Sequence, residues 1–424
     1  MRIAKFTVPP GAELAAAASL AKRRDSVGED VRRVVAETMD DVRLRGDDAV
    51  IEYSLKFDHN EPYELTRAEI DELASLCPPE LYAIMTEAAE NIRAYQARLL
   101  PKTNIWEADI GVLGQIVTPI ERVGIYTPGG TAAYPSSLLM AVVPAKTAGV
   151  KEIVLCTPPT ANLNAAVIAA AKIAGVNRIF AVGGIAAIAS MTYGAVGVPK
   201  VDKIVGPGNA YVAEAKRFAF GTVDIDMIAG PSEILVIADA NANPRLAAAD
   251  MLSQAEHDPM AAAILVTTDD ALADAVTQEL ELQLETLPRR DIAESSLRDY
   301  GAICVCTDLD SAAALSNAVA PEHLEVMTTD TKRVVDKITN AGAIFVGSNS
   351  PEPLGDYFAG PSHILPTNGT AKFFSPVSVE SFLKKSSFIG ATSAGIAAVA
   401  DKIAAFARAE GFEAHARAAE LRKR

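Results

Sequence analysis

Basic residues are scarce in this 424-residue sequence: 39 Lys and Arg stand against 54 Asp and Glu, which gives a formal net charge of −15. A chain this acidic repels the phosphates of nucleic acids and of anionic membranes, so we expect neither as a partner. Long apolar runs are missing too. The most apolar late segment is broken by Asp401 and Lys402, and no membrane span is predicted. Near the N-terminus an Ala/Leu run precedes Lys22-Arg23-Arg24, the reverse of the order in a secretory signal.

Cysteine is rare as well, with four residues in the chain: Cys77, Cys156, Cys304 and Cys306. The last three lie in strand-like runs, where a buried packing role is ordinary. We therefore expect neither a disulfide nor a catalytic thiol, and we place the chain in the reducing cytoplasm.

Histidine is the third scarce residue, with five occurrences. In LSQAEHDP, Gln254 and His257 are three apart and share a helix face, although an amphipathic helix that ends in a solvated turn explains this stretch as well. The next one, His323, directly follows Glu322 and resembles half of an acid/base pair. A Gln, two His and an Asp are suitable ligands for zinc, but the spacing is no metal motif, so both interpretations stay open. The other histidines are His59 in a turn-like stretch, His363, and His415 near the C-terminus.

Apolar periodicity predicts helices over 27–57 and 79–100. From about residue 150, short β-rich runs alternate with Ala-rich helical runs, which is typical of parallel sheets covered by helices. The number of such runs exceeds one domain of usual size, so we expect two α/β domains. Past about residue 377 the pattern is helical and lacks strands, as in a tail that docks elsewhere.

Five loops after or between apolar runs are rich in Gly, Pro and polar residues: GIYTPGGTAAYPSS, VGPGNAY, IAGPSE, APEHLEV and GDYFAGPSHILPT. In open parallel sheets, ligands bind beyond the carboxyl ends of strands, so these loops are where we expect the site. No G-x-G-x-x-G fingerprint follows a strand and no Walker loop occurs, so spacing alone leaves a dinucleotide possible but undemonstrated.

Together these segments resemble histidinol dehydrogenase from about residue 27 to the C-terminus. The similarity is carried by YTPGGTAAYPSSLLM, VDKIVGPGNAYVAEAKR, IDMIAGPSEILVIAD, DMLSQAEHDP, APEHLEV and GDYFAGPSHILPT, in the family's order. The resemblance implies an NAD-dependent, zinc-requiring, four-electron oxidation of L-histidinol through L-histidinal to L-histidine, the last two steps of histidine biosynthesis. The implied partner is thus a small amino alcohol.

The resemblance also assigns residues. Glu322 matches the carboxylate that activates water, and His323 matches the general base. Tyr126 and Asn209 match positions that contact NAD. The implied zinc ligands are Gln254, His257, Asp356 and His415, and the implied substrate-binding residues are these four with Ser232, His323, His363 and Glu410.

For the fold, the resemblance implies an α/β protein with two incomplete Rossmann-like domains, parallel sheets, and one domain inserted in the other. We expect an N-terminal segment over 1–25, a first domain over 26–126 and 238–376, a second domain over 127–237, and a helical dimerisation tail over 377–424. Family dimers are intertwined, so the tail of one chain, with His415, would complete the site of the other.

Three positions depart from the family pattern. Ala186 stands where a Gln that contacts NAD is usual, Ala141 where an Asn is usual, and Ser362 where an Asn is usual. An Ala cannot hydrogen-bond a cofactor, so NAD binding is expected to differ. The alternatives are a related zinc- and NAD-dependent dehydrogenase of another small polar alcohol such as a sulfonated diol, a metal-assisted hydrolase, and a silent scaffold. The presence of both Glu322 and His323 argues against the scaffold.

Overall fold

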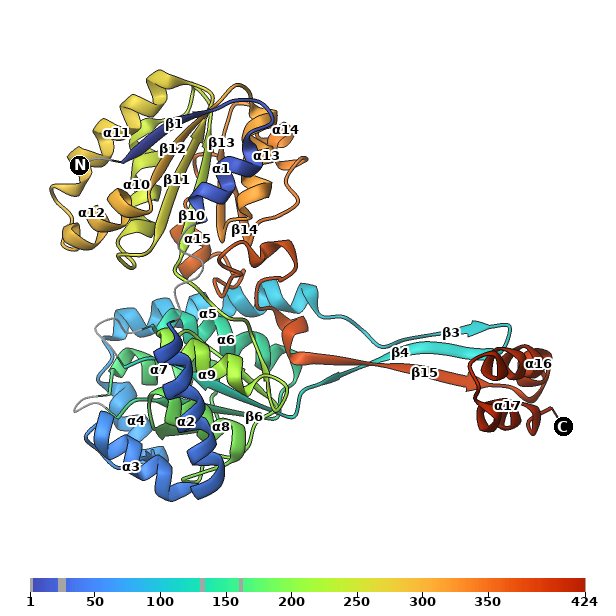
Figure 1. Cartoon of the computed structure of the whole chain (residues 1–424). Coiled ribbons are helices and arrows are strands. Elements are labelled where there is room, and N and C mark those ends of the chain that lie inside the picture. Colours follow the sequence, from blue (N-terminus) through green and yellow to red (C-terminus); the bar gives the residue numbers. More distant parts are fainter. Residues whose placement is uncertain (1–2, 22–27, 130–133, 160–162, 424) are drawn as a thin grey trace.

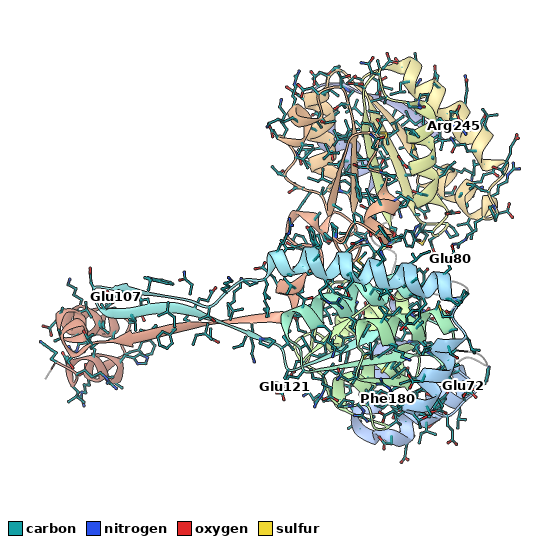
Figure 2. All side chains as sticks on the ribbon, turned by 180° about the vertical axis from the view of Figure 1, so that it is seen from behind. Glu72, Glu80, Glu107, Glu121, Phe180 and Arg245 are labelled. Atoms are coloured by element: carbon teal, nitrogen blue, oxygen red, sulfur yellow. The ribbon has the colours of Figure 1, made fainter. Side chains whose placement is uncertain are left out.

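The computed structural model describes residues 3–21, 28–129, 134–159 and 163–423. It has two α/β lobes and a long arm that leaves one lobe and carries two helices at its tip (Figure 1). Seen from behind, Glu107 on the arm lies well away from both Phe180 in one lobe and Arg245 in the other (Figure 2). Within the described residues, no helix combines the length and apolarity that a membrane crossing requires.

The first lobe contains a six-stranded parallel sheet in the order β1-β12-β11-β10-β13-β14. Its strands are β1 (Ala4–Val8), β10 (Glu233–Ala238), β11 (Ala262–Thr267), β12 (Ala302–Cys306), β13 (His323–Met327) and β14 (Ala343–Val346). One face is covered by α10 (Pro244–Ala255), α11 (Asp270–Leu284) and α12 (Arg290–Asp299), the other by α1 (Glu13–Leu20), α13 (Leu309–Val319) and α14 (Thr331–Val335). The interior strands β10 and β11 are buried along their whole length because helices cover both faces of the sheet.

The second lobe contains a six-stranded sheet in the order β2-β7-β6-β5-β8-β9, parallel except for β2. Its strands are β2 (Tyr63–Glu64), β5 (Arg122–Tyr126), β6 (Glu152–Thr157), β7 (Arg178–Ala181), β8 (Lys203–Val205) and β9 (Asp224–Ile225). One face is covered by α4 (Arg67–Ser75), α5 (Pro79–Leu99), α6 (Pro135–Ala148) and α7 (Ala165–Ala174), the other by α2 (Glu29–Arg45), α3 (Asp47–Phe57), α8 (Gly184–Tyr193) and α9 (Ala210–Ala219).

The helix expected over 27–57 is divided into α2 and α3 by Gly46, whose φ of 60° ends the first helix. The helix expected over 79–100 is α5. Several helices that follow strands begin at an Asn whose side chain accepts main-chain N–H groups. Asn164 caps α7, Asn209 caps α9 and Asn243 caps α10.

The arm is a three-stranded antiparallel ribbon of β3 (Asn104–Ala108), β4 (Gly111–Pro119) and β15 (Leu383–Ala391). Two helices at its tip, α16 (Ser393–Ala409) and α17 (Glu413–Glu420), pack on each other. Between the lobes the chain forms α15 (Glu352–Tyr357). The 3₁₀ turns η1 (Thr370–Lys372) and η2 (Val379–Phe382) follow, and η2 packs against α5 and α6 of the second lobe.

The α/β class, the parallel sheets and the helical C-terminal segment are confirmed. Strand pairing nevertheless places three segments differently from expectation. Within 1–25, β1 joins the sheet of the first lobe; within 26–126, β5 is a central strand of the second lobe. The tail over 377–424 is not free of strands, because β15 pairs with β4 along its whole length. The pairings of β1 with β12 and of β4 with β15 join segments more than 250 residues apart, so the order of elements along the chain does not reveal them. The expected domain boundary at residue 126 falls directly after β5, which belongs to the second lobe.

Candidate active site

The residues of interest meet between the lobes, at the amino edge of the first sheet. His323 is the first residue of β13, with Glu322 just before it, and Ser232 directly precedes β10. The expectation that the site lies beyond carboxyl ends of strands is therefore wrong for this lobe. The loops IAGPSE and APEHLEV lead into strands instead of out of them, which their composition alone did not reveal.

The main chain of Glu233 fixes the acid/base pair. The Glu233 N–H donates to Glu322 Oε2 at 2.8 Å, and the Glu233 carbonyl oxygen lies 3.1 Å from His323 Nδ1. Both side chains are buried, at 6% and 3% exposure. His323 Nε2 points away from this contact, 3.6 Å from Asp356 Oδ1. Neighbouring positions thus face one site because one of them precedes the strand.

The end of α10 contributes Gln254 and His257. Gln254 is completely buried, and neither atom of its side-chain amide has a hydrogen-bond partner in the described part of the chain. A buried unpaired amide costs on the order of 1–3 kcal/mol. This orphaned amide, which lies on the helix that ends beside His257, fits a metal ligand better than a packing residue.

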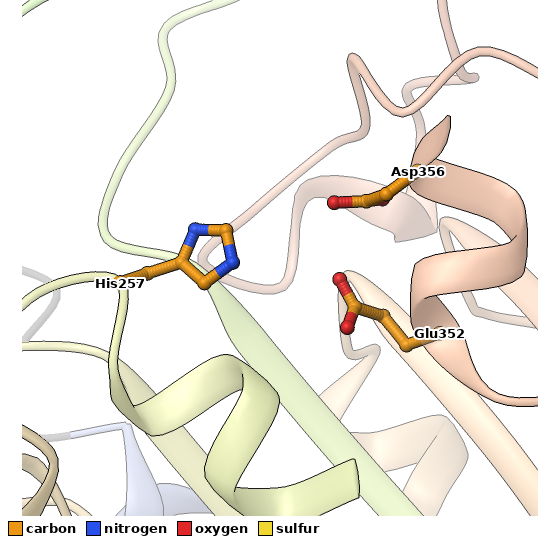
Figure 3. Close-up of side chains that lie close together, drawn as sticks. All are labelled: His257, Glu352 and Asp356. Atoms are coloured by element: carbon orange, nitrogen blue, oxygen red, sulfur yellow. The ribbon is translucent and has the colours of Figure 1, made fainter. Parts of the chain in front are cut away.

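A third element, α15, brings two carboxylates to the same place. One ligand atom each from His257, Glu352 and Asp356 lies within 4.8 Å of the others. Figure 3 shows the two carboxylates turned toward the imidazole from the opposite side. Glu352 was not predicted from the sequence. Its spacing of four from Asp356, in PEPLGDY, was the available signal.

His363 links the two lobes. Its Nδ1 lies 2.9 Å from the main-chain oxygen of Asp356, and its Nε2 lies 2.9 Å from Ser137 Oγ at the start of α6. Ser137 is buried and was also not predicted. Next to His257, a cavity of 350 Å³ lies between α5, α6 and α15, a volume suited to a small molecule.

Burial and charge separate the proton affinities of these groups. Burial raises the pKa of Glu322 to about 7. Burial lowers the pKa of His323, but the carboxylates of Glu322, Asp356 and Glu352 outweigh it and raise that pKa to about 10. Burial raises the pKa of Asp356, yet its contacts with His323 and His363 hold it at about 2. At neutral pH Asp356 is therefore ionised, Glu322 is close to the midpoint of its titration, and His323 holds a proton that it loses only near pH 10.

The residues predicted to contact NAD lie at a different edge. In the second sheet, strand order reverses between β5 and β8, and nucleotides bind beyond the carboxyl ends of strands at such a switch point. Tyr126 ends β5, and its hydroxyl accepts the Gly184 N–H at 3.1 Å. Asn209 follows β8 and is exposed. Between them, a Cβ at Gly206 would collide with the carbonyl oxygen of Tyr126, so only Gly allows this close approach.

The last two predicted residues are not in this site. Glu410 ends α16 and His415 lies in α17, both exposed at the tip of the arm (Figure 1). His415 contacts the ring of Phe412, at 5.2 Å between centroids. Within one chain, the arm separates them from the other predicted site residues.

Comparisons with known proteins show the family of this chain. The family model for histidinol dehydrogenase matches residues 21–423. The chain belongs to the histidinol dehydrogenase family. It is 52% identical over 411 residues to histidinol dehydrogenase from Geobacillus kaustophilus, covering 95% of this chain and 96% of that protein, and 50% identical to the one from Bacillus subtilis, covering 96% of each. The crystal structure of histidinol dehydrogenase from Elizabethkingia anophelis matches with a TM-score of 0.94 at 40% identity, over 99% of this chain and 98% of that one.

As a member of the histidinol dehydrogenase family, the chain is an oxidoreductase of histidine biosynthesis. The three departures from the family pattern lie inside the second lobe or at its edge. Ala186 in α8 and Ala141 in α6 are both buried in the apolar core, at 5% and 0% exposure. Ser362 is buried as well, and its hydroxyl accepts the Ile364 N–H at 3.2 Å.

Proposed function

We propose that this chain oxidises L-histidinol to L-histidine through L-histidinal, with zinc as its metal and NAD as its electron acceptor. The observation that carries the proposal is the convergence of His257, Asp356 and His323, from three separate elements, on one point between the lobes. Gln254, His257 and Asp356 would hold the ion together with His415. Zinc supplies a template that grips the amino alcohol and orients its carbinol carbon.

His323 is suited to remove the alcohol proton. Its Nδ1–H donates to the Glu233 carbonyl oxygen, so in the neutral ring the lone pair is on Nε2, on the side of the metal ligands. In the first oxidation Nε2 would take the hydroxyl proton, and NAD, when bound, would supply the acceptor for the hydride that leaves the carbinol carbon. Glu322, held by the Glu233 N–H, then takes a proton from the water that adds to the aldehyde. The second oxidation repeats the first on the hydrated aldehyde.

NAD would bind at the crevice between β5 and β8, with Tyr126 and Asn209 beside it. Asn209 lies at the N-terminus of α9, where main-chain N–H groups favour phosphate. Ser232, His363 and Glu410 would contact the substrate. Ser232 and His363 lie near the acid/base pair in one chain, whereas Glu410 would come from another copy.

We also propose a homodimer, because His415 and Glu410 lie at the end of an arm and only a second copy can bring them to a site. Cytoplasmic location completes the proposal. All four cysteines are buried and free, as a reducing compartment requires.

The decisive experiment is an assay of the purified full-length chain with L-histidinol, NAD and zinc at alkaline pH. Two NADH formed per histidinol, lost on chelation and restored by zinc, are expected. A panel of small diols, including a sulfonated one, tests whether another polar alcohol is preferred. If histidinol yields no NADH, the proposal fails, and absence of thermal stabilisation by NADH would favour a metal-assisted hydrolase.

A further inference from the structure

A buried ion pair lies beside the proposed NAD crevice. Lys216 belongs to α9 and Asp226 directly follows β9, and their side chains are 3% and 2% exposed. Lys216 Nζ contacts Asp226 Oδ1. A buried ion pair loses the hydration of both charges, so it adds little net stability compared with an apolar pair of similar size. The pair is therefore better explained by what it holds in place than by the stability it contributes.

Both charged side chains bind the main chain of Gly206. Lys216 Nζ donates to the Gly206 carbonyl oxygen at 2.9 Å, and the Gly206 N–H donates to Asp226 Oδ2 at 2.9 Å. Gly206 directly follows β8 with a φ of 132°, and its close approach to the Tyr126 carbonyl oxygen excludes a Cβ. The ion pair thus fixes both polar main-chain groups of a residue whose backbone conformation favours Gly.

The orientation of Gly206 determines where α9 begins. Only Pro207 and Gly208 separate it from Asn209, the N-terminal cap of that helix. Side chains of an α-helix lean toward its N-terminus, so Lys216, about two turns into α9, reaches back to the turn that precedes the helix. The N–H groups at the start of α9, which suit a phosphate, are thereby held in a fixed direction.

Asp226 also fixes the next segment of the chain. Its Oδ1 accepts the Met227 N–H at 2.7 Å, at the start of the segment that crosses from β9 in the second lobe to β10 in the first. That segment ends at Glu233, whose main chain holds Glu322 and His323. One ion pair therefore contacts both the turn at the nucleotide crevice and the segment that leads to the acid/base pair.

We propose that Lys216 and Asp226 are positioning residues of the NAD site, which together hold the Gly206 turn and the start of α9 in the geometry that binds the cofactor. Both side chains are buried, so they act through the main chain of Gly206 and not by contact with NAD. The inference rests on the proposed function, because it presupposes that NAD binds in the crevice between β5 and β8.

The test compares NADH affinity, and steady-state kinetics with L-histidinol, between the full-length enzyme and a double variant. Lys216→Met with Asp226→Asn removes both charges at similar volume, so no unpaired charge is left inside the protein. The double variant is expected to bind NADH about tenfold more weakly and to raise KM for NAD about tenfold, as for a lost hydrogen bond to a charged group, with little change in kcat. A role in stability alone would lower the melting temperature and leave NADH affinity and KM unchanged.

The chain offers a matched control on the same two strands. Lys203 and Asp224 are the first residues of β8 and β9, and they pair at 2.7 Å at the opposite, amino end of these strands. Lys203→Met with Asp224→Asn removes the same two residue types without changing the contacts of the Gly206 turn. NADH affinity and KM for NAD should therefore stay unchanged in the control.

Equal NADH affinity and KM in the Lys216→Met/Asp226→Asn variant and the unaltered enzyme would overturn the inference, as would an equal loss in the control. If the double variant does not fold, Lys216→Arg carries the test. It keeps the charge beside Asp226, but its planar guanidinium cannot donate to Gly206 from the same point, so KM for NAD should rise several-fold, and an unchanged KM would count against the inference. An unaltered chain that binds no NADH would instead refute the proposed function itself.

Discussion

The ring orientation of His323 is set by the main chain, not by another side chain. Because Nδ1 is held by the Glu233 carbonyl oxygen, Nε2 is the atom available to the substrate. His323→Asn should keep zinc and histidinol binding but lower kcat by about 10²–10⁴-fold, the usual contribution of a general base. Steady-state kinetics with zinc titration check this. An unaltered kcat would remove His323 from the role of base.

Glu322 gives a pH dependence with a definite sign. Its pKa is raised by burial to about 7, so below that pH it is protonated and cannot accept a proton from water. With histidinal as substrate, kcat should therefore rise as pH increases through about 7 and continue to rise as His323, with a pKa of about 10, loses its proton. In Glu322→Gln the step near pH 7 should disappear. A persistent step would assign it to another group.

The sequence allowed some site residues to be predicted and not others. Gln254 and His257 are three residues apart and share a helix face, and Glu322 and His323 are adjacent. Each pair is therefore visible in the sequence itself. Glu352 and Ser137 were not, because they acquire meaning only through contacts across 99 and 226 residues, with Ser253 and His363.

At the scale of elements, Asn209 caps a helix, and under the proposed function it also contacts NAD. Its side chain accepts the N–H groups of Tyr211 and Val212 at 3.1 Å and so caps α9. Asn209→Ala should lower stability by about 1 kcal/mol through loss of the cap and should also raise KM for NAD. Asn164→Ala removes an equivalent cap from α7 and should lower stability without changing KM.

Thermal denaturation and NAD saturation curves of the two variants check this pair of effects. If Asn209→Ala and Asn164→Ala have the same KM for NAD, Asn209 acts as a helix cap and does not contact NAD.

Element types were more predictable than their partners. The alternation of β-rich and Ala-rich runs predicted helix-covered parallel sheets, because period and composition are local properties. The strand β15 escaped prediction. It is exposed along much of its length and contains Lys384, Lys385, Ser386 and Ser387, so it lacks the apolar run of a buried strand. Its pairing with β4 is what makes it a strand.

At the scale of the whole molecule, the proposed function requires residues from two chains in each site. Mixing a His415→Ala chain with a Glu322→Ala chain should restore activity, because one of the two sites in a heterodimer would receive all its residues. Recovery of up to about half of the heterodimer sites is expected after joint refolding, by the symmetry of a two-fold dimer. NADH formation by the mixture, compared with each variant alone, is the measurement. Mixtures that form heterodimers yet stay inactive would contradict shared sites.

The arm has a consequence for how the active enzyme assembles in a cell. Phe406 and Phe412 at its tip remain 71% and 53% exposed, although His415 contacts one face of the Phe412 ring. A newly synthesised copy would keep this apolar surface exposed and would be inactive until it pairs with a second copy. Activity would then grow faster than linearly with gene expression at low abundance, and a copy with a defective site would leave one complete site in each mixed dimer that it forms.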